Sequence, residues 1–473
     1  MSIQFANIQF GYSEGGKPLL SDFSARFDEK KITILTGASG CGKSTLLYLA
    51  AGIYPHNGGF LDGGSVLVEG VSPESLAPKE RCRLVGMMFQ NPELQFCMDT
   101  VRNELIFCLE NICMEPDRME AAMDEALAFC EISHLKERTL LSLSGGERQK
   151  VMLACLTLFK PKWLLLDEPF ANIDNASAAA IAAKLRQMHE EYGTGILAVD
   201  HRLDNWLGAA QEVRIMEDGR LLPDAMDAAR LDDELLEEHG IIVPGRSYRP
   251  SLPPAEEGDE VLRIEHLSLS YGKETVLKDI SASFRRGKIY AIVGESGCGK
   301  SSLFGALSGI CRYRGKVFLE GQDLKSGRGR RQSVGKMGFV TQSPQDQFVS
   351  SNVRQEILTS LRKNPEAEAL SEEILRGIRL WRYREVSPYL LSQGQQRRLG
   401  VAALVAYDCH VLVCDEPTYA QDRRNTIAVM DALARQAREH QTALIFSTHD
   451  RQLARDYADE ILILEGGELH AIH

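Results

Sequence analysis

Short apolar runs that end in glycine, acidic or histidine positions recur along the chain. The runs KITILTG (31–37), KWLLLDE (162–168) and GILAVDH (195–201) are apolar at successive positions. Such runs predict strands that are buried on both faces of a parallel sheet. An Ala-rich segment with helical spacing (176–191) separates the last two runs, and residues 91–140 have helical periodicity without a strand pattern. The pattern predicts an α/β fold with a helix-covered parallel sheet and a helical insert.

This pattern occurs twice. GASGCGKST (37–45) corresponds to GESGCGKSS (294–302), and LLLDEP (164–169) corresponds to VLVCDEP (411–417). The landmarks from residue 144 onward have their counterparts 248 residues later, whereas earlier landmarks are 252 to 259 residues apart. A repeat of this length predicts two tandem domains with a common fold. The constant spacing in the second half of each copy indicates a packed unit with little tolerance for insertion.

A segment of different composition separates the copies. We therefore expect domains at 1–223 and 261–473, joined by a linker at 224–260. The linker contains 11 acidic and 3 basic residues, with four prolines in its second half, which is typical of a connecting segment. A short helix is expected around Leu231–Glu238.

The composition agrees with two globular domains and excludes several classes. A length of 473 residues is about twice the size at which one hydrophobic core stops growing. No stretch approaches the ~18 apolar residues of a membrane-spanning helix, and the first residues lack a signal-peptide pattern, so a cytosolic protein is expected. Eleven cysteines without a C-x-x-C pair argue against a disulfide framework or a zinc site. The net charge of −12 disfavours non-specific nucleic-acid binding.

Each copy contains G-x-x-x-x-G-K-[ST] between a predicted strand and a predicted helix. In that setting the glycines let backbone N–H groups turn toward a phosphate, and the helix N-terminus adds a positive dipole end. Lys43 and Lys300 are expected to reach the β- and γ-phosphates of a nucleotide, and Ser44 and Ser301 to bind Mg²⁺. The residues expected to form the two loops are Gly37, Ser39, Gly40, Cys41, Gly42, Lys43, Ser44, Thr45, Gly294, Ser296, Gly297, Cys298, Gly299, Lys300, Ser301 and Ser302.

Acidic pairs end a buried strand in both copies. Asp167 and Asp415 stand where a Walker-B carboxylate positions Mg²⁺. The residues that follow them, Glu168 and Glu416, are placed to polarise an attacking water. An Asp-Glu pair at a strand end is more often a solvated turn. Here it recurs in both copies downstream of a phosphate loop, which favours the catalytic interpretation.

A histidine follows a further apolar strand in each copy. His201 and His449 are both 34 residues after the corresponding aspartate. A single histidine in such a place is more often structural. Because the spacing repeats, we interpret both as γ-phosphate contacts.

The segments LSGGE (143–147) and LSQGQ (391–395) complete a motif order that resembles the ATPase subunits of ABC transporters. The resemblance covers both copies and leaves out only the linker. It implies an α/β fold with two P-loop ABC-type ATPase domains. Each domain would be a mainly parallel sheet flanked by helices, with a helical signature subdomain and an N-terminal antiparallel β portion. It also implies that the protein hydrolyses ATP with Mg²⁺.

Several further roles are implied by the same resemblance. Gln90 and Gln342 are similar to the Q-loop glutamines, which assist catalysis, contact Mg²⁺ and link the nucleotide to a membrane partner. Tyr12 and Tyr271 stand where the family stacks a ring on adenine, although a strand tyrosine can equally be core. ANID and AQD resemble D-loops, the second departing from the usual pattern. The implied Mg²⁺ ligands are Ser44, Gln90, Asp167, Ser301, Gln342 and Asp415.

The resemblance further implies that the two domains pair head to tail within one chain, with ATP between the Walker residues of one and the signature of the other. Site one would combine Lys43, Ser44, Gln90, Asp167, Glu168 and His201 with Ser392 and Gly394. Site two would combine Lys300, Ser301, Gln342, Asp415, Glu416 and His449 with Ser144 and Gly146. Neither set lacks a member.

One signature position differs between the copies. Gln393 stands where the first copy has Gly145. If this position requires φ > 0, a residue other than glycine costs about 1–2 kcal/mol; otherwise the cost is crowding near the phosphate. The hypothesis is that site one is slower or weaker than site two but competent.

The surroundings of the Q-loops narrow the resemblance. FQNPELQF (89–96) and TQSPQDQF (341–348) are similar to the ATPases of energy-coupling-factor importers, which take up vitamins or cobalt and nickel ions. This implies an integral membrane coupling subunit, a membrane substrate-binding subunit and a peripheral position on the cytoplasmic face of the membrane. In some thiamine-precursor importers of this type the two ATPases are fused.

Two alternatives remain. One is the tandem ATPase of a sugar-type importer, which often lacks one catalytic Glu or Lys. The other is a soluble ABC ATPase acting on ribosomes or DNA, for which the basic segment KSGRGRRQSVGK (325–336) is the one favourable feature. The acidic linker and unpatterned cysteines argue against the second alternative, and no nucleic-acid partner is expected.

Overall fold

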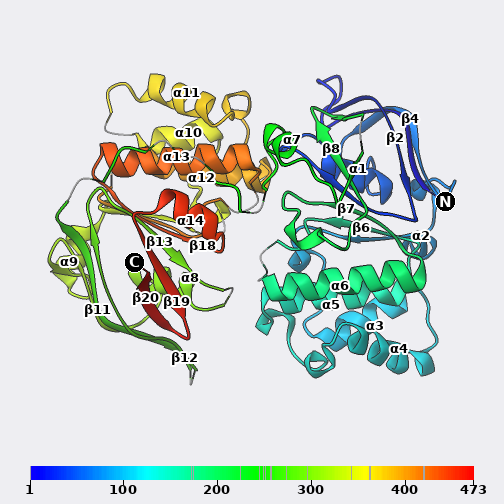
Figure 1. Cartoon of the computed structure of the whole chain (residues 1–473), viewed down its shortest axis with the longest axis horizontal. Coiled ribbons are helices and arrows are strands. Elements are labelled where there is room, and N and C mark those ends of the chain that lie inside the picture. The colour runs from blue at the N-terminus through cyan, green and yellow to red at the C-terminus, as the bar shows by residue number, and fades with distance from the viewer. Residues whose placement is uncertain are drawn as a thin grey trace. The chain divides into compact units, whose positions relative to one another are not determined.

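The computed structural model divides the chain into two compact units, residues 1–244 and 245–473, which we describe separately (Figure 1). The division falls inside the segment expected to be a linker. The structure describes residues 2–472 except 172, 174, 224, 244, 249, 251, 256–257, 273, 296, 342–343, 362–363, 408 and 419–420. The side chains of residues 93, 175, 330, 332, 344, 393 and 472 are also outside the description.

The first unit alternates strands and helices. Its strands are β1 (Ser2–Gly11), β2 (Leu20–Asp28), β3 (Ile32–Thr36), β4 (Phe60–Val68), β5 (Val85–Met88), β6 (Trp163–Asp167), β7 (Gly195–Val199), β8 (Glu212–Glu217), β9 (Arg220–Leu221) and β10 (Met226–Asp227). Its α-helices are α1 (Lys43–Ala50), α2 (Pro78–Leu84), α3 (Val101–Asn111), α4 (Pro116–Phe129), α5 (Gly145–Phe159), α6 (Asn175–Tyr192) and α7 (Asp233–Glu238). Its 3₁₀ turns are η1 (Pro73–Ser75), η2 (Pro92–Leu94), η3 (Ser133–Leu135), η4 (Leu140–Ser142) and η5 (Asp204–Trp206).

The second unit has a similar order of elements. Its strands are β11 (Glu260–Tyr271), β12 (Glu274–Arg285), β13 (Ile289–Val293), β14 (Arg314–Leu319), β15 (Gln322–Asp323), β16 (Met337–Val340), β17 (Val411–Cys414), β18 (Ala443–Thr448), β19 (Glu460–Glu465) and β20 (Glu468–Ile472). Its α-helices are α8 (Lys300–Leu307), α9 (Gly327–Ser333), α10 (Val353–Ser360), α11 (Ala367–Gly377), α12 (Gln393–Val405), α13 (Arg423–Glu439) and α14 (Arg451–Tyr457). Its 3₁₀ turns are η6 (Pro344–Gln347), η7 (Trp381–Tyr383) and η8 (Pro388–Leu390). The order differs in that β15 stands in place of η1 and α14 in place of η5.

Both units place the phosphate-loop strand inside a mainly parallel sheet, with an antiparallel strand, β10 or β20, at one edge. In the first unit the order is β10-β8-β3-β7-β6-β5, and in the second it is β16-β17-β18-β13-β19-β20. The strands β3 and β13 each lie between two parallel neighbours. A separate antiparallel sheet, β2-β1-β4 or β12-β11-β14-β15, accompanies each parallel sheet. The predicted fold, with a parallel sheet, flanking helices and an antiparallel portion, is confirmed.

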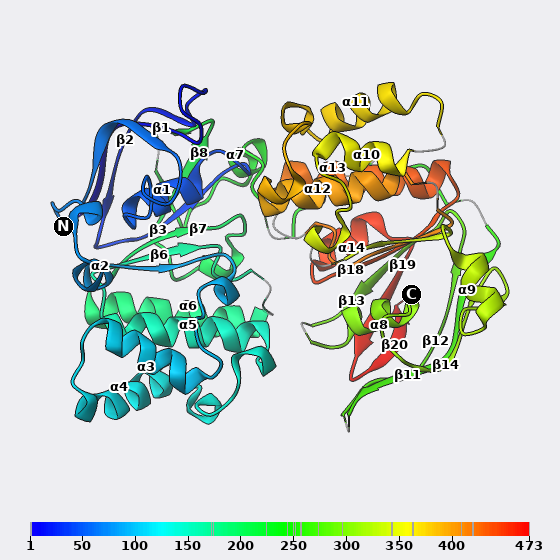
Figure 2. The ribbon, with the colours of Figure 1, turned by 180° about the vertical axis from the view of Figure 1, so that it is seen from behind.

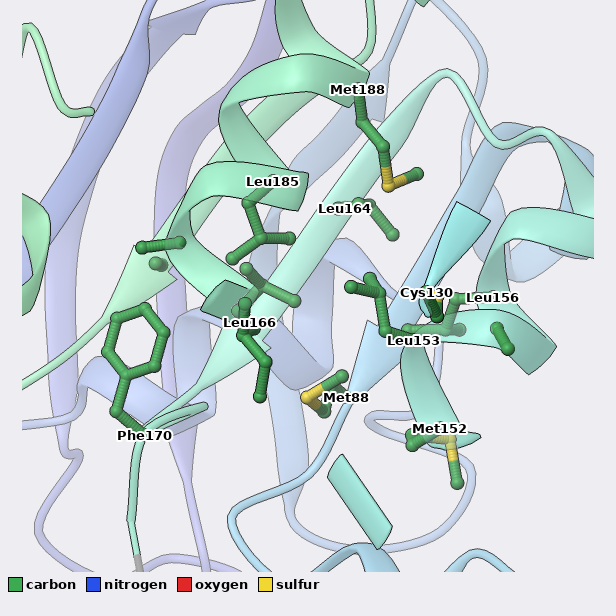
Figure 3. Close-up of a cluster of buried hydrophobic side chains, with 14 of the residues drawn as sticks. Met88, Cys130, Met152, Leu153, Leu156, Leu164, Leu166, Phe170, Leu185 and Met188 are labelled. Atoms are coloured by element: carbon green, nitrogen blue, oxygen red, sulfur yellow. The ribbon is translucent and has the colours of Figure 1, made fainter. Parts of the chain in front are cut away.

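Alternation along the buried strands produces the two faces of each sheet. In β6, Leu164 and Leu166 pack in the cluster that contains α5 and α6 (Figure 3), whereas Trp163 and Leu165 pack in the cluster that contains α1. Because successive side chains of a strand point to opposite faces, a strand covered on both sides must be apolar throughout. Figure 2 shows α5 and α6 on one side of β6 and β7 and α1 on the other.

The helical inserts follow the Q-loop strands as expected. In the first unit α3, α4 and α5 share one core with the sheet. In the second unit α10, α11 and α12 enclose a separate cluster that includes Val353, Leu375 and Leu399. Each insert ends at the N-terminus of a long helix, α5 or α12, which carries the signature segment.

The described parts of the expected linker are packed against one unit or the other. Within the first unit β10 pairs with β8, and Leu236, Ile241 and Val243 join the core. Within the second unit Tyr248 belongs to the core beside α13 and α14. The acidic composition and the prolines predicted a linker. Burial of these apolar residues instead holds the segment against each unit. Among the described helices, none is long and apolar enough to cross a membrane.

Candidate functional site

The last glycine of each phosphate loop has the same backbone conformation. Gly42 and Gly299 directly precede α1 and α8, and both have φ of 109°. This region of φ favours glycine, and a Cβ at Gly299 would lie only 2.9 Å from a methyl group of Leu277. Glycine at this point lets the loop turn closely into the helix. The first backbone N–H groups of each helix are therefore available to a phosphate.

The loop lysines are buried and held by backbone carbonyl groups. Lys43 Nζ donates to the carbonyl oxygens of Gly37 and Ala38 at 2.8 and 2.9 Å. Lys300 Nζ makes the same pair of bonds, at 2.7 and 2.8 Å, to the first two residues of its own loop. Both ammonium groups thus lie inside the loop, where phosphate oxygens can replace the carbonyl partners.

In the first unit a hydroxyl and a carboxylate, two of the three predicted Mg²⁺ ligands, contact each other, whereas the third, Gln90, contacts Glu168. Ser44 Oγ donates to Asp167 Oδ1 at 2.9 Å, and Tyr48 Oη donates to Asp167 Oδ2 at 3.3 Å. Burial and the charge of Glu168 raise the pKa of Asp167 to about 6, against the opposing effects of Ser44, Lys43 and Tyr48. A buried carboxylate beside a hydroxyl is a suitable oxygen donor set for Mg²⁺, whose charge would compensate the burial. The residues present fit this ion.

The second unit arranges the corresponding aspartate differently. Asp415 Oδ1 accepts a hydrogen bond from Ser447 Oγ at 2.6 Å, and the same hydroxyl oxygen accepts from the Glu416 backbone N at 2.9 Å. Ser301 lies exposed in the first turn of α8. Val199 occupies the position of Ser447 in the first copy, so the serine bond is specific to the second unit.

The two candidate catalytic glutamates share a rare backbone conformation. Glu168 and Glu416 both have φ of 48°. A residue other than glycine in the left-handed region is uncommon and persists where the surroundings hold it. The Glu168 backbone N donates to the Val199 carbonyl oxygen at 2.8 Å, and that of Glu416 to Ser447. The strand that precedes each histidine therefore fixes the glutamate.

Two other predicted site residues, His201 and Gln90, contact Glu168. Its Oε1 lies 3.1 Å from His201 Nε2, and its Oε2 accepts from Gln90 Nε2 at 2.7 Å. Burial acts to raise the pKa of Glu168, but the charge and hydrogen bond of His201, with Lys43 and Gln90, outweigh burial and lower it. Glu168 is therefore held as a carboxylate, which can accept a proton from water.

Glu416 has the corresponding histidine contact. His449 Nδ1 lies 3.2 Å from Glu416 Oε2. Burial acts to raise the pKa of Glu416, but His449, Lys300 and Arg397 outweigh burial and lower it. The histidines differ in burial: His201 is 7% exposed, whereas the side chain of His449 is 44% exposed. Gln342 and Ser296, both predicted for this site, lie outside the described residues.

The predicted adenine-stacking tyrosines lie beside the phosphate loops. Tyr12 Oη is 2.8 Å from Thr45 Oγ1, and Tyr271 Oη is 3.4 Å from Ser302 Oγ. Both tyrosines are more than half exposed. An aromatic ring that is anchored by its hydroxyl and open to solvent on a face can stack on a base.

The signature serines cap the helices α5 and α12. Ser144 and Ser392 accept from the backbone N of Glu147 and Gln395, and both form a complete capping box. Gln393 is the first residue of α12 and has a helical backbone. The condition of φ > 0 considered for this position is therefore not met, and no left-handed strain arises. The side chain of Gln393 lies outside the described residues.

Two further buried residues of the second unit contact segments that carry predicted site residues. Arg397 is 2% exposed and donates to the Thr341 carbonyl oxygen at 2.6 Å and to that of Asp415 at 3.5 Å. Gln421, in the second D-loop, donates to the Gly394 carbonyl oxygen at 2.9 Å. The departure of AQD from the usual D-loop pattern marks Gln421 in the sequence. No motif marks Arg397, but the 248-residue spacing between the copies could have identified it, because Gln149 occupies this position in the first copy.

Comparison with known proteins agrees with this geometry. The ABC transporter family model matches residues 20–171 and 277–419. A Bacillus subtilis protein, YkoD, named for HMP/thiamine import ATP binding, is 32% identical over 97% of this chain and 88% of its own length. An ABC transporter ATP-binding protein of Methanosarcina mazei is 28% identical over 99% of this chain and 88% of its own length. The chain therefore belongs to the ABC transporter family, as an ATP-binding protein with two fused ATPase domains.

Solved structures with the same fold include ribosome-associated proteins. A chain from a ribosome-bound archaeal assembly of Pelota and ABCE1 has a TM-score of 0.70 and 19% identity, covering 98% of this chain and 78% of its own. The archaeal ribosome recycling factor aABCE1, in complex with stalk protein aP1, has a TM-score of 0.64 and 18% identity, with coverages of 98% and 90%. At this identity the likeness concerns the fold alone.

Proposed function

We propose that this chain is the ATP-hydrolysing subunit of a membrane importer of the energy-coupling-factor type, for a vitamin such as a thiamine precursor or for a transition-metal ion. The observation that carries the proposal is the likeness, along almost the whole chain, to a relative named for HMP/thiamine import. The protein would act at the cytoplasmic face of the membrane, bound to an integral coupling subunit and a substrate-binding subunit.

Hydrolysis at each site would use residues from both domains. The phosphate loop with Lys43 or Lys300 binds the β- and γ-phosphates, and the glutamate accepts a proton from the attacking water. His201 or His449 contacts the γ-phosphate. The capped N-terminus of the other domain's signature helix, α5 or α12, presents amide groups to the same phosphate. Closing on ATP and opening after hydrolysis would be passed to the membrane partner.

The fit of the donor set supports Mg²⁺ as a cofactor. Ser44 and Asp167 would hold the ion at site one, and Ser301 and Asp415 at site two, with the Q-loop glutamine as a further ligand. When bound, Mg²⁺ would neutralise charge on the phosphate oxygens. The protein residues orient the nucleotide and exclude bulk water from the buried carboxylates.

Exposed apolar side chains near the Q-loops support a protein partner. Leu94, in the turn after Gln90, is 79% exposed, and Leu141, just before the first signature, is 93% exposed. In the second unit Val349 and Leu390 are 77% and 79% exposed at the corresponding regions. Exposed apolar groups beside a functional element favour an interaction site.

Purification from membranes tests the importer assignment. The tagged chain, expressed in its native host and extracted with detergent, should co-purify with small integral membrane proteins. Leu94→Glu combined with Val349→Glu should lose them while ATP binding is retained. Leu207→Glu, which changes a leucine that is 56% exposed elsewhere in the first unit, is the matched control. Recovery of ribosomal proteins or DNA in place of membrane proteins would instead support the soluble alternative.

A further inference from the structure

The segment between the domains is attached, on each side, to the residue that follows a site histidine. In the first unit Ile242 forms a parallel β-bridge with Arg202, directly after His201. In the second unit Tyr248 Oη donates to Asp450 Oδ2 at 2.8 Å, directly after His449. The two attachment points are six residues apart in the sequence.

Tyr248 holds both ends of the short helix α14. Its ring is 5% exposed, and its backbone N donates to Asp456 Oδ2 at 2.6 Å, in the last turn of the helix. Asp450 caps the first turn, because its Oδ1 accepts from the backbone N of Gln452 and Leu453 at 2.9 and 3.1 Å. The tyrosine therefore fixes the cap that immediately follows His449.

The same stretch also contacts the start of α13. Arg423, the first residue of that helix, donates to the Ser247 carbonyl oxygen at 2.6 Å and lies 4.9 Å over the Tyr248 ring. Arg423 is 6% exposed and follows Asp422, the D-loop aspartate that caps α13. Residues 247–248 thus connect the segments that carry the D-loop and the histidine of the second unit.

We propose that Tyr248 is a positioning residue for the second ATP site, holding His449 through the cap at Asp450. The inference rests on the assignment of His449 to that site in the proposed function. The side chain of His449 is 44% exposed, so its place depends on the backbone that Asp450 anchors as well as on its contact with Glu416. His201 is 7% exposed and is held by its own surroundings. The effect of Tyr248 should therefore be confined to site two.

Tyr248→Phe removes the hydroxyl bond and keeps the ring on Arg423. In the full chain with site one blocked by Glu168→Gln, it should lower kcat for ATP hydrolysis about tenfold, the scale of one lost bond to a charged group. The KM for ATP should change less than about twofold, because the phosphate loop binds the nucleotide independently. With Glu416→Gln blocking site two, the same variant should leave the rate of site one unchanged.

Tyr457→Phe is the matched control. Tyr457 lies in α14, and its hydroxyl donates to Asp431 Oδ1 at 2.8 Å, away from Asp450. It should lower the melting temperature as much as Tyr248→Phe does without lowering kcat. An unchanged kcat in Tyr248→Phe, or an equal loss in Tyr457→Phe, overturns the positioning role. His449→Ala tests the assignment of His449 to site two independently of the role of Tyr248. If this variant leaves site-two turnover intact, the assignment is wrong.

Discussion

The two candidate catalytic glutamates are retained in both copies, whereas some of the residues that contact them differ. Glu168 and Glu416 keep the same left-handed backbone, at a cost of about 1–3 kcal/mol each. Their surroundings have diverged: Ser447 replaces a valine, and Arg397 replaces a glutamine. The conformation of the glutamate is therefore retained while the groups that support it change.

The contribution of Arg397 to the stability of the region around Glu416 can be measured. Its guanidinium is buried between the Thr341 and Asp415 carbonyl oxygens. Arg397→Met should lower the free energy of unfolding by about 1–3 kcal/mol, because two carbonyl groups lose the hydrogen bonds that the buried guanidinium donates. Arg397→Gln, which introduces the residue of the first copy, should lower it less, since the amide can still donate. Urea denaturation measures both, with exposed Arg435→Gln as the control, and a methionine variant at least as stable as the glutamine variant contradicts this account.

At the scale of elements, the signature helices distinguish the two sites. Both begin with a serine cap closed by the third helical residue, Glu147 in α5 and Gln395 in α12. Gln393 is the first residue of α12 with a helical backbone, so no backbone strain distinguishes it from Gly145. The hypothesis that site one is slower than site two therefore concerns ATP binding and turnover, and not the folding of α12.

Restoring glycine at position 393 tests whether Gln393 slows site one without affecting the stability of the helix. With site two blocked by Glu416→Gln, Gln393→Gly should raise the turnover of site one by a few-fold, without raising the melting temperature, because glycine is the poorer helix former by up to ~1 kcal/mol. Gly145→Gln, with site one blocked, should slow site two in the same way. Single-site phosphate-release rates test both changes. Equal rates before and after the glycine is restored would show that Gln393 has no effect on site one.

The strands and phosphate loops could be predicted from the sequence, whereas the packing of the segment between the domains could not. The strands β3, β6, β7 and β13 were predictable because a strand buried on both faces is apolar throughout. The phosphate loops were predictable because Lys43 and its glycines are neighbours in sequence. The burial of Ile241, Val243 and Tyr248 was not predicted, because net charge and proline content dominated that segment. Contacts such as Tyr248 with Asp450 join residues 202 apart, and no local motif encodes them.

At the scale of the whole molecule, the arrangement of both sites depends on which domains pair. Each unit has its own core, sheet and phosphate loop. If an ATP site needs a signature from another domain, a single unit cannot complete it. A fused chain supplies both halves at a fixed ratio, and we propose that the two domains pair within the chain.

Trapping the nucleotide tests this pairing. In Glu168→Gln combined with Glu416→Gln, ATP turnover should fall by at least about a hundredfold, because neither site retains its base, while ATP binding persists. With ATP and Mg²⁺ the variant should remain a particle of one chain, 52.6 kDa, by light scattering. Lys43→Ala combined with Lys300→Ala, which should not retain ATP, is the control. An ATP-dependent particle of twice that mass would place the pairing between chains, and unchanged turnover would remove both glutamates from catalysis.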